Sequence, residues 1–158
     1  MKVEFELNGK EKKFDVKPGE VLLDLLRDNG YKSVKRGCET GDCGACMVLV
    51  DGRAMTSCTL FAAQANEREI RTVEGLEDEL AERLKESLLE AGAVQCGFCI
   101  PGVLISAYSL IKHNEDPSEE EIKAALDGNL CRCTGYVKQI DAIEETVDSI
   151  GGSSDGKK

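Results

Sequence analysis

The sequence predicts an α+β protein with two small domains: a mixed sheet packed on one helix, then a four-helix domain. Two observations support this division. Apolar and charged residues alternate near the N-terminus, as in a half-buried strand, whereas leucines recur every fourth residue in the second half. The eight cysteines also fall into two groups of four, one in each half. We place the boundary near Glu74-Gly75, which gives domains of residues 1–74 and 75–150.

The first domain begins with two short strands. Residues 3–7 alternate apolar and charged side chains, and Asn8-Gly9 forms a tight turn because both residues tolerate positive φ. Phe14 and Val16 then alternate on the second strand. The remaining elements follow in chain order: a helix Val21–Asp28 closed by Gly30, a buried strand Met47–Val50, a turn at Asp51-Gly52 into a further strand, and a last strand Glu69–Val73.

Four amphipathic helices are predicted for the second domain. Pro101 fits the first turn of the second helix, Ser118 and Glu121 form a capping box for the third, and Thr134 caps the fourth. Gly151 sits where the C-cap of the fourth helix belongs. The apolar faces consist of Leu80, Leu84 and Leu88; Val103, Leu104, Ala107, Tyr108 and Ile111; Ile122, Ala125 and Leu126; and Tyr136, Ile140, Ile143, Val147 and Ile150.

Composition excludes several classes of function. The chain has 158 residues and a net charge of −10, which argues against a nucleic-acid partner because phosphate contacts need a basic face. No apolar run is long enough for a transmembrane segment, and the N-terminus lacks the apolar stretch of a signal peptide. We therefore expect a cytoplasmic protein, in a compartment where grouped cysteines bind metal rather than pair as disulfides. Residues 151–158 are small and polar, and we expect them to be disordered.

The first cysteine group predicts a 2Fe–2S cluster. Cys38, Cys43 and Cys46 follow the plant-type spacing C-x4-C-x2-C, and Cys58 supplies a fourth thiolate. Glycines in this loop allow it to turn sharply around a cluster and let backbone N–H groups approach the sulfurs. One feature departs from photosynthetic ferredoxins, which place the fourth cysteine much further on: only eleven residues separate Cys46 from Cys58.

The second cysteine group is less diagnostic. Cys96 and Cys99 form a C-x2-C pair before the predicted second helix, and Cys131 and Cys133 form a C-x-C pair before the fourth. Both pairs therefore lie near helix N-termini, which favour anionic thiolates. Spacing alone leaves both an iron–sulfur cluster and a four-cysteine zinc site open.

Three motifs together resemble the iron–sulfur subunit of the molybdenum hydroxylases, a family that includes xanthine dehydrogenases, aldehyde oxidoreductases, carbon monoxide dehydrogenases and 4-hydroxybenzoyl-CoA reductases. The resemblance covers about residues 1 to 150, without departure at any cysteine. The motifs are G-C-E-T-G-D-C-G-A-C at 37–46, Q-C-G-F-C-I-P-G at 95–102 and G-N-L-C-R-C-T-G-Y at 128–136.

The resemblance implies a fold and a set of partners. It implies a plant-ferredoxin-like β-grasp domain with one 2Fe–2S cluster, followed by a four-helix domain with a second 2Fe–2S cluster. Gln95 matches a position that contacts a molybdopterin cofactor held by a large partner subunit, and Cys133 matches the ligand nearest to it. An FAD-binding subunit is the expected electron acceptor in a hetero-oligomer.

The sequence shows no nucleophile–base pair and no phosphate-binding loop, so we expect the substrate site on a partner chain. The chain is then the non-catalytic, electron-transferring subunit of an oxidoreductase. Among substrates we favour xanthine or a related purine, with aldehydes, carbon monoxide and aromatic acyl-CoA also open. Three alternatives remain: a freely diffusing two-cluster ferredoxin, a zinc-stabilised structural module and a disulfide-stapled secreted protein.

Overall fold

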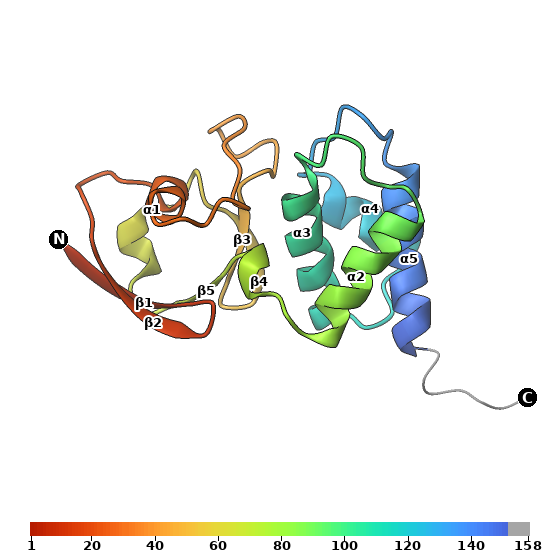
Figure 1. The fold of residues 1–158 in the computed structure, drawn as a ribbon, viewed down its shortest axis with the longest axis horizontal. Coiled ribbons are helices and arrows are strands. Elements are labelled where there is room, and N and C mark those ends of the chain that lie inside the picture. The colour runs from red at the N-terminus through yellow and green to blue at the C-terminus, as the bar shows by residue number, and fades with distance from the viewer. Residues whose placement is uncertain (152–158) are drawn as a thin grey trace, which may run out of the picture.

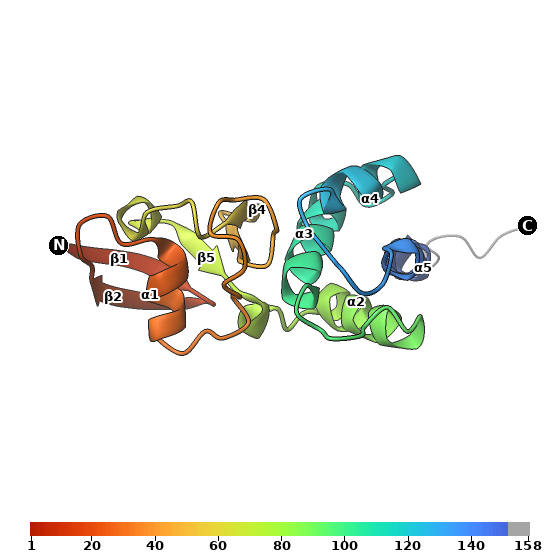
Figure 2. The same cartoon turned by 90° about the horizontal axis from the view of Figure 1, so that it is seen from above.

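The computed structural model describes residues 1–151, which form a sheet-containing half and a helical half side by side (Figures 1 and 2). This arrangement confirms the predicted α+β class. The first half contains β1 (Lys2–Leu7), β2 (Lys10–Asp15), α1 (Leu22–Asp28), β3 (Met47–Val50), β4 (Arg53–Thr56), the 3-10 turn η1 (Ala62–Ala65) and β5 (Glu69–Arg71). The 3-10 turn η2 (Val73–Gly75) leads into α2 (Glu79–Glu90), α3 (Ile100–His113), α4 (Glu119–Leu126) and α5 (Val137–Gly151).

The sheet is mixed, with the strand order β2-β1-β5-β3-β4. Its two hairpins use the predicted turns: Asn8 and Gly9 have φ values of 52° and 75°, and Asp51 and Gly52 have 49° and 79°. β1 pairs in parallel with β5, and the other neighbours are antiparallel. With α1 packed on one face, this is the β-grasp arrangement expected from the resemblance.

The strand alternation places one apolar core between the sheet and α1. The apolar side chains of β1 are about 1% exposed, as expected for a strand buried on one face only. They pack in one cluster with Leu22, Leu23, Leu25 and Leu26 of α1. The helix ends at Asp28, with Asn29 as its C-cap residue, and Gly30 follows with φ 94°, so the predicted C-terminal glycine lies where the chain turns away.

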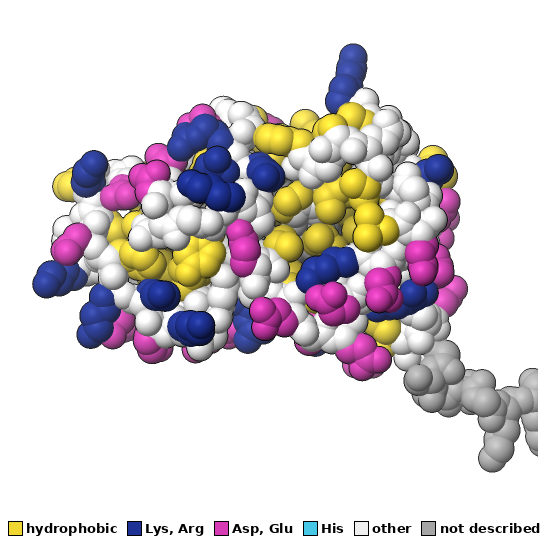
Figure 3. Space-filling view, in the orientation of Figure 1, with side chains coloured by type: hydrophobic (Ala, Val, Ile, Leu, Met, Phe, Trp, Pro, Cys, Tyr) yellow, Lys and Arg dark blue, Asp and Glu magenta, His cyan; other side chains and the backbone are white. Residues whose placement is uncertain are grey.

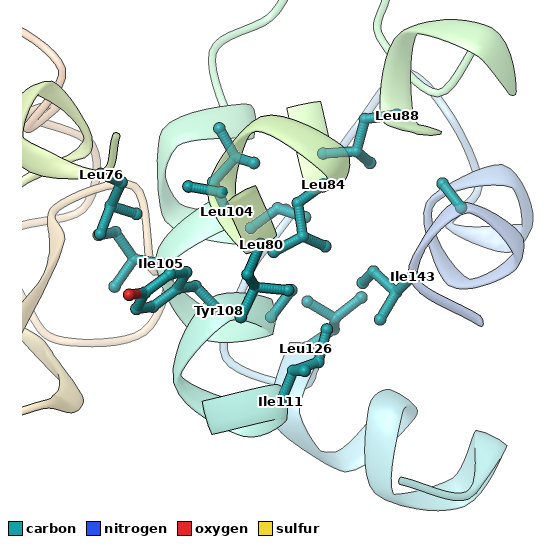
Figure 4. Close-up of a cluster of buried hydrophobic side chains, with 14 of the residues drawn as sticks. Leu76, Leu80, Leu84, Leu88, Leu104, Ile105, Tyr108, Ile111, Leu126 and Ile143 are labelled. Atoms are coloured by element: carbon teal, nitrogen blue, oxygen red, sulfur yellow. The ribbon is translucent and has the colours of Figure 1, made fainter. Parts of the chain in front are cut away.

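A second apolar core holds the four helices together, and Figure 4 shows side chains from α2, α3, α4 and α5 meeting in it. Leu84, Ile105 and Ile143 are fully buried there. The capping box at the start of α4 is confirmed, because Ser118 Oγ accepts from Glu121 N and the Glu121 carboxylate accepts from Ser118 N.

β3 connects the two cores because both of its faces are buried. Val48 and Val50 point into the core beneath α1, while Leu49 joins the helical core. Polar contacts reinforce this junction: Ser109 Oγ on α3 accepts from Ala54 N at 3.1 Å and donates to Gly52 O at 3.2 Å. The β3–β4 hairpin therefore packs directly on α3.

Two glycines let the cysteine loop of the first half approach the helices. A Cβ on Gly44 would lie 2.1 Å from the carbonyl oxygen of Gly128, and a Cβ on Gly102 would lie 2.2 Å from the carbonyl oxygen of Gly44. Neither position has room for a side chain. Asn129, which is 1% exposed, donates from its side-chain amide to the same Gly44 oxygen at 3.4 Å.

The structure differs from the predicted elements at several ends. β2 ends at Asp15, before the predicted Val16, and α1 begins one residue later than predicted, at Leu22. β5 ends at Arg71 because η2 begins two residues later. α5 begins at Val137 rather than after Thr134, because Gly135 and Tyr136 have φ values of 70° and 72°, which no right-handed helix accommodates. The helix then runs through Gly151. Residues 152–158, most of the predicted disordered tail, lie outside the described residues.

None of the helices within residues 1–151 is long and apolar enough to cross a membrane. The domain limits of 1–74 and 75–150 stay a prediction.

We expect Gly44→Ala to lower the free energy of unfolding by about 2–5 kcal/mol, since it adds a backbone clash to the strain of positive φ. Gly9→Ala is the matched control: Gly9 also has positive φ, but a Cβ there would meet nothing within 4 Å. Urea unfolding of both variants would measure the difference. Equal losses would show that the contact between Gly44 and Gly128 does not constrain the junction.

Candidate iron–sulfur centres

The β3–β4 hairpin brings two cysteines of the first group together. Cys46 directly precedes β3, and Cys58 lies two residues after β4. Because Met47 pairs with Thr56, the chain on either side of the hairpin remains adjacent at its open end. Ser57 fixes this end: its N–H donates to Cys46 O at 3.3 Å and its hydroxyl donates to the same oxygen at 2.7 Å.

The loop before β3 presents Cys38 and Cys43. The backbone N–H groups of Thr40 and Cys43 each donate to Cys38 Sγ at 3.4 Å, and Cys38 N–H donates to Cys43 Sγ at the same distance. The approach of N–H groups to sulfur that the glycine-rich loop predicts is therefore observed. A Cβ on Gly37 would lie 2.6 Å from Cys43 Sγ, so only glycine fits beside this sulfur.

The second group comes from two loops of the helical half. Cys96 lies between α2 and α3, and Cys99 is the N-cap residue of α3, as the sequence predicts. Cys131 and Cys133 lie between α4 and α5, further from the start of a helix than expected. In both halves the cysteine-bearing loops lie along the upper edge of the view in Figure 1.

Tyr136 and Thr134 shape the second of these loops. Cys131 N–H donates to the hydroxyl of Tyr136 at 2.9 Å, and the Thr134 hydroxyl contacts Cys131 Sγ at 3.1 Å. Thr134 Oγ1 also accepts from Tyr136 N–H at 3.2 Å. Thr134 therefore holds a loop rather than capping a helix.

The eight cysteines form four close pairs and no disulfide. Side-chain contacts join Cys38 to Cys43 and Cys46 to Cys58 in the first half, and Cys99 to Cys131 and Cys96 to Cys133 in the second. Among the described residues, no three His, Cys, Asp or Glu side chains lie close enough to hold one metal ion. Two pairs in each half fit a centre of two irons that takes four thiolates.

Burial and hydrogen bonding make the sulfurs unequal. Hydrogen bonds led by those from Thr40 lower the pKa of exposed Cys38 to about 6. Burial, with the neighbouring thiols Cys46 and Cys131, raises the pKa of Cys58 and of Cys99 to about 11. Burial alone would raise the pKa of Cys131, but hydrogen bonds led by those with Thr134 outweigh this effect and lower the pKa to about 7.

The two groups are linked through the backbone. Leu130 N–H, in the residue before Cys131, donates to the carbonyl oxygen of Cys43 at 2.9 Å. A Cβ on Gly37 in the first loop would also lie 3.8 Å from the ring of Phe98. Phe98 stands between Cys96 and Cys99 in the sequence. The structure therefore places the two cysteine groups on either side of one contact surface.

The two residues expected at a partner cofactor are open to solvent. Gln95 and Cys133 are both exposed, on the loops that carry the second group. Sequence reasoning missed Gln139, which is fully buried and donates from Nε2 to Cys99 Sγ at 3.5 Å. It also missed the Leu130 contact, because a backbone hydrogen bond between loops leaves no pattern in the sequence.

These geometries describe a protein in two halves, each of which presents four cysteines, the number of thiolates that a 2Fe–2S cluster takes. Residues 5–80 match the family of 2Fe-2S iron-sulfur cluster binding domains, and residues 72–144 match the family of 2Fe-2S binding domains. The chain thus contains two 2Fe–2S domains, in the expected order.

Relatives identify the family more narrowly. The nicotinate dehydrogenase small FeS subunit of Eubacterium barkeri is 47% identical over 92% of this chain and 94% of its own. The xanthine dehydrogenase iron-sulfur-binding subunit of Escherichia coli O157:H7 is 43% identical over 89% and 91%. A chain in the crystal structure of quinoline 2-oxidoreductase from Pseudomonas putida 86 matches with a TM-score of 0.88, 42% identity and coverage of 98% and 97%. The chain belongs to the iron–sulfur small subunits of the molybdenum hydroxylases.

Thiol alkylation of the metal-free chain provides a test of the electrostatics. At pH 7 we expect iodoacetamide to modify Cys38 at least about tenfold faster than Cys58 or Cys99, because only a thiol with a lowered pKa is mostly thiolate there. The rate at Cys38 should fall as the pH drops below its pKa of about 6. Peptide mass spectrometry would follow each site, with the urea-unfolded chain as the control. Equal alkylation rates at the three cysteines in the folded chain would contradict these differences in pKa.

Proposed function

We propose that this chain is the electron-transferring subunit of a molybdopterin-dependent hydroxylase. Cys38, Cys43, Cys46 and Cys58 bind one 2Fe–2S cluster, and Cys96, Cys99, Cys131 and Cys133 bind the other. The supporting observation is the hydrogen bond from Leu130 N–H to Cys43 O at 2.9 Å. In this proposal Cys43 is a ligand of the first cluster, and Leu130 directly precedes Cys131, a ligand of the second.

Each 2Fe–2S cluster supplies one-electron chemistry at a potential set by its surroundings. The chain contributes the route between the clusters. Cys43 and Cys131 are connected through covalent bonds and that single hydrogen bond, without a solvent gap. The glycines at 44 and 102 keep this route short because neither position has room for a side chain. Burial of Cys46 and Cys99 limits water on the inner side of each centre.

The helical half is the proposed docking side for the large molybdopterin-binding subunit. Phe98, Leu130 and Val137, on or beside the cysteine loops, are 47%, 56% and 64% exposed. The face in Figure 3 shows hydrophobic side chains gathered over the helical half. Large apolar side chains that are exposed around a redox centre are typical of a surface that a permanent partner covers. In this assembly Gln95 and Cys133 face the partner's cofactor.

The opposite end of the route is the first cysteine group, where Cys38 is exposed. We assign electron exit to this group, toward an FAD-binding subunit of the same hetero-oligomer. The whole assembly acts in the cytoplasm, where a reducing environment keeps the eight cysteines unpaired before the clusters are inserted. A freely diffusing ferredoxin is the alternative, and it predicts that the chain purifies without partners.

For the substrate, we propose a nitrogen-containing aromatic ring compound. The relatives described above carry the names of nicotinate dehydrogenase, xanthine dehydrogenase and quinoline 2-oxidoreductase. All three named compounds are aromatic nitrogen heterocycles. Xanthine, the substrate favoured from the sequence, belongs to this class, and the first of these relatives adds nicotinate as an equal candidate. The substrate pocket lies on the large subunit.

The ligand sets can be tested by low-temperature EPR of the dithionite-reduced chain. We expect about four irons and four acid-labile sulfides per chain, with two distinct 2Fe–2S signals. Cys46→Ser should weaken or abolish one signal and Cys99→Ser the other, because each change removes a thiolate from a different centre. Zinc without labile sulfide would refute the function, and loss of both signals in each variant would refute the division into two sets.

Stopped-flow reduction of the intact complex tests both the substrate class and the role of Gln95. Nicotinate or xanthine should reduce the clusters, whereas an aliphatic aldehyde, carbon monoxide and 4-hydroxybenzoyl-CoA should not. With the active substrate, Gln95→Ala should slow reduction of the helical-domain cluster about tenfold or more and leave both EPR signals present. Gln64→Ala, an exposed change in η1, is the control. An unchanged rate in Gln95→Ala would exclude the cofactor contact.

A further inference from the structure

Gln139 is an amide buried where a core residue is expected. It lies in the first turn of α5, its backbone N–H bonds to Tyr136 O at 2.9 Å, and its side chain is 0% exposed. The next turn contributes Ala142 and Ile143 to the helical core. An apolar residue at this position would continue that core.

The amide is only half satisfied. Its Nε2 donates to Cys99 Sγ at 3.5 Å, while Oε1 has no hydrogen-bond partner within the described part of the chain. Burying an unpaired amide oxygen is unfavourable, so stability alone does not account for glutamine here. Within residues 1–151, the hydrogen bond that this side chain makes goes to a sulfur.

That sulfur is shielded from solvent. Cys99 is 7% exposed, whereas Cys96 and Cys133 of the same group are exposed to water. Water can donate to the outer sulfurs but has little access to Cys99. Gln139 supplies the donor that solvent cannot. In the first group, by contrast, Cys38 Sγ obtains its N–H donors from its own loop, at Thr40 and Cys43.

We infer that Gln139 is a positioning residue that raises the reduction potential of the helical-domain cluster by hydrogen bonding to Cys99 Sγ. This inference rests on the proposed function, in which Cys99 is a cluster ligand. Adding one electron to the cluster increases the negative charge on its thiolate sulfurs, and an N–H donor stabilises that charge. The oxidised cluster gains less from the same bond. The difference favours the reduced form, and no proton is transferred.

The direct test is Gln139→Met in the full chain, purified anaerobically with its partner subunits. Methionine has a similar length and volume but no N–H donor. An EPR-monitored redox titration should show a three- to tenfold smaller equilibrium constant for one-electron reduction of the helical-domain cluster, where tenfold corresponds to about 59 mV. The first-domain cluster should keep its potential. Gln139→Leu, which also lacks the donor, gives an independent second measurement.

Thr146→Val is the matched control. Thr146 is also fully buried on α5, but its hydroxyl donates to Ala142 O at 2.8 Å, within its own helix. It should leave both potentials unchanged. The urea midpoint should not fall in Gln139→Met, because methionine removes an unpaired buried oxygen.

The outcomes separate this inference from the proposed function. Two normal EPR signals in the unchanged chain, with equal potentials in wild type and both Gln139 variants, would overturn the inference alone. Equal shifts of both clusters, or the same shift in Thr146→Val, would also overturn it by showing a general packing effect. Absence of 2Fe–2S signals from the wild-type chain would overturn the proposed function and this inference with it.

Discussion

The close approach of the cysteine loop to the N-terminal end of α3 is the constraint on which the arrangement of the two halves depends. The carbonyl of Gly44 lies where a side chain on Gly102 would begin, and Asn129 donates to the same carbonyl. The two segments come this close only because neither Gly44 nor Gly102 carries a side chain. It fixes the separation of the two cysteine groups at the level of main-chain atoms, which move less than side chains do.

β3 supports that contact from the other side. A four-residue strand with Val48 and Val50 facing one core and Leu49 facing the other has no solvent-exposed face. Such a strand transmits the position of α1 to α3 through close packing. Cys46 is attached to its first residue, so the first cysteine group is positioned by both cores at once.

Much of this structure could be predicted from the sequence because its signals are local. Asn8-Gly9 and Asp51-Gly52 form hairpin turns through positive φ, and Ser118 with Glu121 starts α4, each within a few residues. Family motifs extended this to the β-grasp fold. The start of α5 was missed because Thr134 has the chemistry of a cap, while positive φ at Gly135 and Tyr136 delays the helix to Val137. Gln139 was missed because glutamine in an amphipathic helix usually marks the solvent face.

The uneven exposure of the sulfurs bears on how the protein survives in air. Cys96 and Cys133 are open to solvent, whereas Cys99 in the same group is buried. Oxygen and peroxide reach exposed sulfur and iron first, and oxidation beyond the sulfenic stage is largely irreversible. A chain left alone after cluster insertion is therefore open to oxidation at Cys38 in the first half as well as at Cys96 and Cys133 in the helical half. Partners that cover both sets of loops early protect the subunit, so the order of assembly determines how much of the protein stays usable.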